Sequence, residues 1–142
     1  GFSYRMRTDL LVNNFVQTAV QKKELLIFEP NFRRNYVHIV DVVNAFIFAI
    51  ENFSKLKGNI FNLGLSSANL TKLMLAKKIK KNYKNIKKKI IKDRSDPDKR
   101  DYYVSNEKIE KAGFKPKISL DEGIKELINL FSNVDVNFIN NY

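Results

Sequence analysis

Hydrophobic positions recur at helical spacing in three parts of the chain. The first repeat predicts a helix over about residues 8–22, with Thr8 as its cap. A weaker repeat predicts a helix over about 70–81, and a third predicts the last helix of the chain, from about residue 120. Ser119 and Glu122 have the spacing of a capping box that would start this last helix. The apolar positions of these repeats are Leu11, Val12, Phe15, Val16, Ala19, Val20, Leu70, Leu73, Met74, Ile79, Leu120, Ile124, Leu127, Ile128 and Phe131, and those of the last helix are expected to face inward.

Short apolar runs predict β-strands between these helices. They cover residues 25–28, 36–39, 59–63 and 86–91. A further short helix is expected to begin at Ser105 and to end at Gly113, with Pro116 as a stop signal. Strands alternate with helices through the middle of the chain, which predicts an α/β fold.

The segment from Asp41 to Phe53 predicts a helix that is apolar on almost every side. Asp41 is expected to cap it. A helix of this kind is buried on most of its circumference, which a chain of 142 residues rarely achieves alone. We therefore expect this helix to pack on something outside the chain, such as a parallel sheet.

The composition indicates one globular domain. Hydrophobic residues make up 44% of the chain, and there is no cysteine, which fits a reducing compartment. No apolar run approaches the roughly 20 residues of a membrane span. We therefore predict a cytoplasmic protein without a membrane partner. Gly1 to Arg7 resembles a loop inside a larger protein, so we expect the chain to be a fragment.

The net charge of +11 raises the question of a nucleic-acid partner. Ten lysines and no acidic residue lie between Lys72 and Lys92. A nucleic-acid groove more often mixes arginine and aromatic residues with its lysines. The pattern therefore favours a solvated surface, and a basic nucleic-acid-binding module remains the alternative interpretation.

Signals for catalysis are weak. His38 is the single histidine, and it lies in an apolar run, where a structural hydrogen bond is the favoured role. The five glycines are scattered and form no phosphate-binding loop. Tyr83 and Lys87 have a Tyr-x-x-x-Lys spacing, which we attribute to chance because lysine is so frequent there. No catalytic or metal-binding residue is predicted.

Arginine and amide side chains are the candidates for binding. Guanidinium groups offer a planar fork of donors that suits phosphate, and helix starts favour anions. On the residues alone, the favoured interpretation is that each candidate is an ordinary surface residue. The candidates are Arg5, Arg7, Asn14, Arg34 and Arg100.

Seven short motifs follow one another in an order that resembles a known family. They are GFSYRMR (1–7), LLVNNFV (10–16), RRNYVHIVDV (33–42), IFNLG (60–64), DPDKR (96–100), AGFKP (112–116) and LDEGI (120–124). In this order they resemble the C-terminal half of the NAD-dependent nucleotide-sugar epimerase/dehydratase family, the extended short-chain dehydrogenases. The resemblance covers residues 1 to about 131. Tyr4 departs from the family pattern, in which proline is frequent.

This resemblance implies a division of labour. The fold would be the C-terminal part of an NAD(P)-binding Rossmann-like fold, with a small mixed α/β substrate-binding domain over residues 1–132 and a tail over 133–142. NAD or NADP and the catalytic Tyr/Lys pair would belong to an N-terminal portion that is not in this chain. The full-length enzyme would be a homodimer acting on a nucleotide sugar, and the fragment would be inactive alone.

The resemblance also assigns roles within the chain. Asn14, Arg34 and Arg100 would contact the diphosphate of the nucleotide sugar, and Arg5 and Arg7 would face the mouth of the site. Arg33 would be solvated, and Asp41 would have a structural role. A non-catalytic relative that keeps the fold as a scaffold is a further interpretation.

Overall fold

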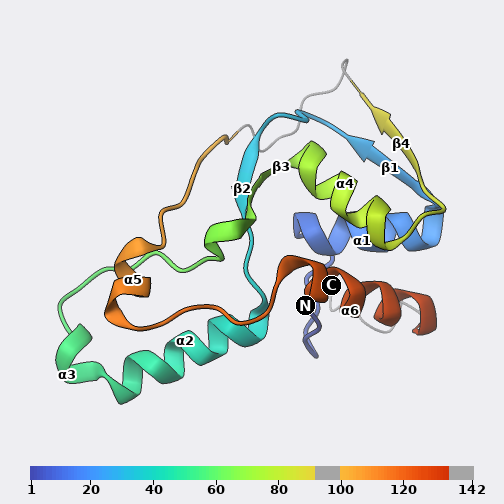
Figure 1. Ribbon diagram of the computed structural model, residues 1–142. Coiled ribbons are helices and arrows are strands. Elements are labelled where there is room, and N and C mark those ends of the chain that lie inside the picture. The colour runs from blue at the N-terminus through green and yellow to red at the C-terminus, as the bar shows by residue number, and fades with distance from the viewer. Residues whose placement is uncertain (92–99, 135–142) are drawn as a thin grey trace.

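The structure is a computed structural model that describes residues 1–91 and 100–134. Helices dominate it, and four short strands form two separate two-stranded sheets (Figure 1). In chain order the elements are α1 (Leu11–Lys22), β1 (Glu24–Ile27), β2 (Arg33–Asn35), α2 (Ile39–Glu51), α3 (Phe53–Leu56), η1 (Ser66–Ala68), β3 (Asn69–Thr71), α4 (Lys72–Asn82), β4 (Lys87–Ile90), α5 (Glu107–Ala112) and α6 (Leu120–Asn133).

The larger core lies where α1, α4 and α6 meet under β1. The apolar stripes predicted for α1 and α6 face this core, because each repeats at about one helical turn. The α6 helix begins with the predicted capping box, in which the side chains and backbone N–H groups of Ser119 and Glu122 bond reciprocally. The fully buried members of the core include Val16, Ala19, Ile27, Leu75, Ile79, Ile124 and Leu127.

The strands β1 and β4 pair in parallel, with Glu24 opposite Lys87 and Ile27 opposite Ile90. Leu25 and Ile27 point into the core, whereas all four residues of β4 are exposed. The pair β2–β3 is antiparallel, with Arg34 opposite Leu70. It lies between the larger core and the α2–α3–α5 part of the molecule (Figure 1).

A smaller core joins α2 to α5 through Ala45, Ile109 and Phe114. Much of the outer side of α2 is uncovered within the described residues: Phe46 is 68% exposed and Ile50 is 75% exposed. This is a large apolar surface for one helix. The burial predicted for α2 is therefore not provided by the chain as described.

Three helix starts differ from the prediction. The α5 helix starts at Glu107 after an N-cap Asn106, so Ser105 lies one residue before the cap position. The α1 helix starts at Leu11, after an N-cap Leu10 that makes no side-chain capping bond, so Thr8 does not cap it. His38 caps α2, where its Nδ1 accepts a hydrogen bond from the backbone N–H of Val40 at 3.3 Å. Asp41, the predicted cap, lies inside the first turn and accepts from a distant segment instead. The residue with the strongest capping preference therefore does not decide where these helices start. The path of the backbone into each helix decides it.

Two predicted strands are absent from the described residues. Residues 36–38 are irregular between β2 and α2, and residues 59–63 have no strand assignment. A strand requires a neighbour for its backbone hydrogen bonds, and the structure provides none for residues 59–63. Within residues 36–38, the N–H of Tyr36 donates to the carbonyl of Ala68 next to the β2–β3 pair, so the extended segment ends before His38.

Some predictions fall on residues that are not described. These are most of the charged loop around Pro97, including the DPDKR motif up to Lys99, and the tail beyond Val134. Among the described helices, none is long and apolar enough to cross a membrane.

Candidate functional site

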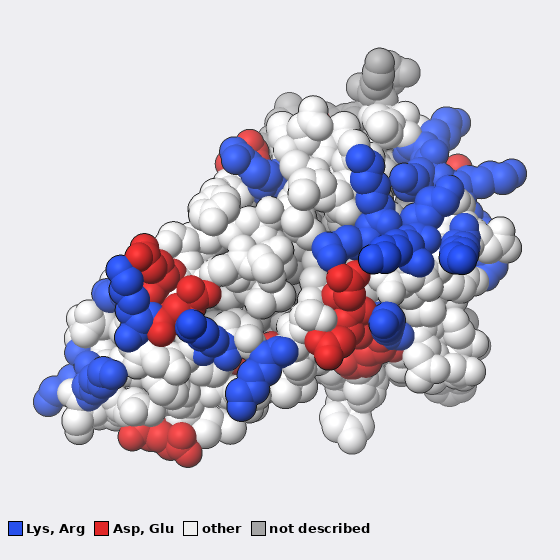
Figure 2. Space-filling view, in the orientation of Figure 1, with Lys and Arg blue, Asp and Glu red and all other residues white. Residues whose placement is uncertain are grey.

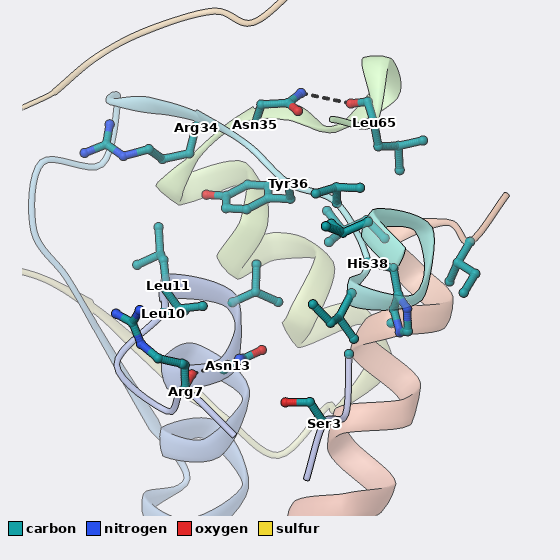
Figure 3. Close-up of a pocket in the computed structure, with 18 of the residues that line it drawn as sticks. Ser3, Arg7, Leu10, Leu11, Asn13, Arg34, Asn35, Tyr36, His38 and Leu65 are labelled. Atoms are coloured by element: carbon teal, nitrogen blue, oxygen red, sulfur yellow. Dashed lines mark hydrogen bonds between the residues drawn. The ribbon is translucent and has the colours of Figure 1, made fainter. Parts of the chain in front are cut away.

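A cavity of about 550 Å³ opens between the start of α1, the segment after β2 and the segment before α6. This volume is in the range of small-molecule sites. Figure 3 shows the cavity, with Arg34, Tyr36 and Asn35 on one side and Arg7, Leu10 and Asn13 on the other. Segments far apart in the sequence therefore build one site.

Arg34 is the fixed cation of this cavity. Its pairing in β2–β3 sets its backbone, and the side chain is buried. Its Nη1 donates to the carbonyl of Arg33 at 2.8 Å and to the carbonyl of Arg100. The ring of Tyr102 lies 5.1 Å from the guanidinium carbon, within range of a cation–π contact. The guanidinium is therefore held in place before any ligand arrives.

The other predicted arginines lie around the same cavity. Arg5, Arg7 and Arg100 all line it, and all three are exposed. Arg7 makes two hydrogen bonds to the carboxylate of Asp9, with Nε–Oδ1 at 2.9 Å and Nη2–Oδ2 at 2.5 Å. These bonds hold the pKa of Asp9 below its usual value. The cavity thus combines four arginines from three separated parts of the chain.

The neighbouring Arg33 lies outside the cavity. It forms an exposed ion pair with Asp101 through Nε and Nη2, at 3.1 Å and 3.2 Å. The pair lowers the pKa of Asp101 from its usual value. Alternation along β2 explains the contrast, because successive side chains of a strand point to opposite faces.

The two asparagines of α1 divide differently from the sequence prediction. Asn14 is exposed and does not line the cavity, whereas the adjacent Asn13 is buried and lines it. The amide of Asn13 donates to the carbonyl of Arg7 at 2.9 Å and holds the arginine-bearing loop against α1. The phase of the buried stripe in α1 carried this information, because Asn13 lies three residues before Val16 and seven before Val20, which are both buried.

The sequence predicts Tyr36 only as part of a strand, yet its side chain lines the cavity. Its hydroxyl oxygen is buried and has no hydrogen-bond partner within the described residues. Burial raises the pKa of Tyr36 well above its usual value, against a smaller opposite effect of the nearby Arg34. A buried hydroxyl that lacks a partner is costly, and a ligand oxygen in the cavity would satisfy it.

His38 has the structural role that was predicted. Its Nε2 lies 2.8 Å from Oε2 of Glu126 in α6, while Nδ1 caps α2. The ring lies against Gly123, where an added Cβ would be 3.1 Å from the ring. His38 therefore joins α2 to α6 beneath the cavity. Among residues 1–91 and 100–134, no group of three His, Cys, Asp or Glu side chains could hold a metal.

The residues around the cavity do not form a dinucleotide cradle. A pyrophosphate cradle needs closely spaced glycines at the start of a helix. The nearby glycines here have other tasks: Gly64 and Gly123 give room to the side chains of Asn35 and His38. The described residues of this chain therefore do not fit NAD(P).

Comparison with known proteins supports the family resemblance found in the sequence. Residues 3–64 match the model of the NAD dependent epimerase/dehydratase family. The resemblance to this family is confirmed.

Matches to individual relatives extend beyond residue 64. An uncharacterized protein of Methanocaldococcus jannaschii is 33% identical over 128 residues, which cover 88% of this chain and 38% of that protein. The mouse dTDP-D-glucose 4,6-dehydratase is 30% identical over 107 residues, covering 70% of this chain and 29% of the enzyme.

The fold also matches solved structures. The UDP-glucose 4-epimerase of Thermus thermophilus, solved in complex with NAD, superposes with a TM-score of 0.69 at 17% identity, and the match covers 88% of this chain and 40% of that protein. The Rossmann-like α/β fold class predicted from the sequence is confirmed. The chain spans 29–40% of the length of these three proteins.

Proposed function

We propose that this chain is the C-terminal, substrate-binding portion of a nucleotide-sugar epimerase or dehydratase, and that its cavity binds the nucleoside diphosphate. The observation that carries the proposal is the set of four arginines around one cavity, with the buried Arg34 at its wall. A diphosphate presents several anionic oxygens, and guanidinium groups bind such oxygens with paired, charge-assisted hydrogen bonds.

The four arginines have different parts in this proposal. Arg34 is the fixed anchor, because its contacts with Tyr102 and the Arg100 carbonyl orient it before binding. The exposed side chains of Arg5, Arg7 and Arg100 close on the ligand from the rim. Tyr36 donates its buried hydroxyl to a ligand oxygen, and Asn13 holds the loop that carries Arg7. Asn13 therefore supports the site through the loop, which differs from the diphosphate contact that the resemblance implies for Asn14.

The redox chemistry belongs to a Rossmann portion outside this chain in our proposal. That portion would bind NAD or NADP, oxidise and re-reduce the sugar, and cover the exposed apolar side of α2. The chain alone would then hold substrate without turning it over. The full-length enzyme would work as a cytoplasmic homodimer.

Isothermal titration of the chain with UDP-glucose, dTDP-glucose and GDP-mannose tests the binding proposal. Arg34→Ala should weaken binding of the preferred nucleotide sugar by roughly 10- to 100-fold, the usual range for a charge-assisted hydrogen bond lost from a buried site. Arg34→Lys keeps the charge but not the fork, and we expect it to lose much of the same affinity.

The matched control is Arg33→Ala, one residue away. Arg33 is exposed, pairs with Asp101 and does not line the cavity, so affinity should change by less than about threefold, as for other surface ion pairs. Circular dichroism verifies that each variant is folded. The proposal fails if no nucleotide sugar binds, or if the Arg33 and Arg34 variants lose affinity equally.

A further inference from the structure

Lysines from α4, from the turn after it and from β4 gather on one side of the molecule (Figure 2). We call this set the basic face. Every member is exposed. Its members are Lys77, Lys80, Lys81, Lys84, Lys87, Lys88 and Lys89.

The charge of the basic face is scarcely neutralised. None of its seven lysines makes an ion pair within the described residues. The carboxylate of Asp121 instead binds Lys78 at 2.6 Å, and Glu24 lies opposite Lys87 in the β1–β4 register. Lys72, which belongs to the same stretch of sequence, is buried and lies outside the face. Concentrated positive charge of this kind attracts an anionic partner.

Aliphatic side chains lie among these lysines. Leu26 is 41% exposed and lies opposite Lys89, while Ile90, at the end of β4, is 46% exposed. Tyr83, in the turn after α4, is only partly exposed: its ring packs against the larger core, and its hydroxyl accepts a hydrogen bond from the ammonium group of Lys23. The face therefore offers lysines and aliphatic groups, without arginine forks or an open aromatic ring.

We propose that the basic face binds the surface of an anionic lipid membrane. Lysines close to such a surface bind by their charge, and exposed aliphatic side chains add contact with the lipid interface. Nucleic-acid surfaces typically add arginine and stacking aromatic residues, which this face lacks. None of the described helices could span a membrane, and binding at the surface through lysines requires no such helix.

The basic face and the cavity lie at opposite ends of α1. Leu11 and Asn13 line the cavity, whereas Lys23, just after the helix, accepts a hydrogen bond on its carbonyl from the N–H of Lys87. The 12 residues of α1 separate the two by about 18 Å. A membrane against the basic face would therefore leave the cavity open to a water-soluble ligand.

Co-sedimentation with vesicles tests this proposal. The full chain should bind vesicles that contain phosphatidylserine in phosphatidylcholine, and not vesicles of phosphatidylcholine alone, and the binding should weaken at high salt. The combined variant Lys87→Gln, Lys88→Gln and Lys89→Gln should lower the partition coefficient by roughly 100-fold, from about fivefold per lysine.

The matched control removes the same charge elsewhere, with Lys57→Gln, Lys115→Gln and Lys117→Gln. These three lysines are exposed and lie in the α3 region and in the segment before α6. The control should retain most of the vesicle binding. The proposal is overturned if anionic vesicles do not retain the chain, or if both triple variants lose binding equally. Tighter binding to a DNA duplex than to the vesicles would overturn it in favour of a nucleic-acid partner.

Discussion

The carboxylate of Asp41 provides a sharp test of how the cavity is held together. Asp41 is 1% exposed, and its two oxygens accept from the backbone N–H groups of Lys117 at 3.0 Å and Ile118 at 2.9 Å. It thus ties the first turn of α2 to the segment that leads into α6. Ile118 and the two residues after it line the cavity. We predict that Asp41→Asn destabilises the fold measurably.

The size of the effect follows from the two bonds. An asparagine amide offers one acceptor oxygen, so one of the two N–H groups loses its partner, at about 1–3 kcal/mol. Loss of a negative charge in the first turn of a helix adds about 0.3–1 kcal/mol. A neutral amide costs less to bury than a carboxylate, which offsets part of this. The expected net loss is about 2 kcal/mol, while Asp41→Ala, which leaves both N–H groups without an acceptor, should lose more.

Urea unfolding followed by circular dichroism measures this loss. The control is Asp121→Asn in the first turn of α6, because the Asp121 side chain is 40% exposed and its pair with Lys78 is open to solvent. Such a pair contributes less than about 1 kcal/mol. If Asp41→Asn changes the free energy of unfolding no more than Asp121→Asn does, the carboxylate does not hold α2 to the α6 segment as argued.

Two further substitutions separate ligand contact from structural support. Tyr36→Phe removes a buried hydroxyl that has no partner in the described chain, so it should leave stability at neutral pH unchanged or slightly higher, while weakening nucleotide-sugar binding by titration calorimetry. Because burial raises the pKa of Tyr36, its contribution to stability is present below the unfolded value of about 10 and is lost as pH rises further, and the phenylalanine variant should lack that part of the loss. Equal affinity in wild type and variant would remove Tyr36 from the site. His38→Ala should lower the melting temperature, because it removes a cap worth about 1 kcal/mol and the contact with Glu126. His38→Asn keeps a capping acceptor and should recover part of the loss. Equal melting temperatures for both variants would refute the capping role.

The exposed apolar side of α2 links the structure to the length of the chain. Phe46 and Ile50 are among its most exposed side chains, and the chain spans 38% of the length of the Methanocaldococcus jannaschii relative. Residues 59–63 show a related feature. They have the apolar pattern of a strand, but no strand pairs with them within the described residues. Both features are expected of elements whose packing partners lie in another part of a larger fold.

Local signals in the sequence were sufficient for the elements that depend on their own residues. The repeats of α1 and α6 predicted which faces are buried, because the 3.6-residue period alone decides them. The capping box of Ser119 and Glu122 and the left-handed Gly113 after α5 were likewise predicted, since each is completed within one helical turn. The four arginines were also identified as candidates, from their chemistry and from the order of the motifs.

Tertiary structure decided everything that needs a distant partner. His38 instead of Asp41 caps α2, because Asp41 accepts from N–H groups more than 70 residues away. Asn13 instead of Asn14 reaches the cavity, because the packing of α1 on α4 and α6 sets the rotation of the helix. Arg33 and Arg34 look alike in sequence, yet strand pairing turns one toward Asp101 and the other toward the cavity. The sequence by itself thus determined which residue types could bind an anion, and only long-range packing determined which of them share one site.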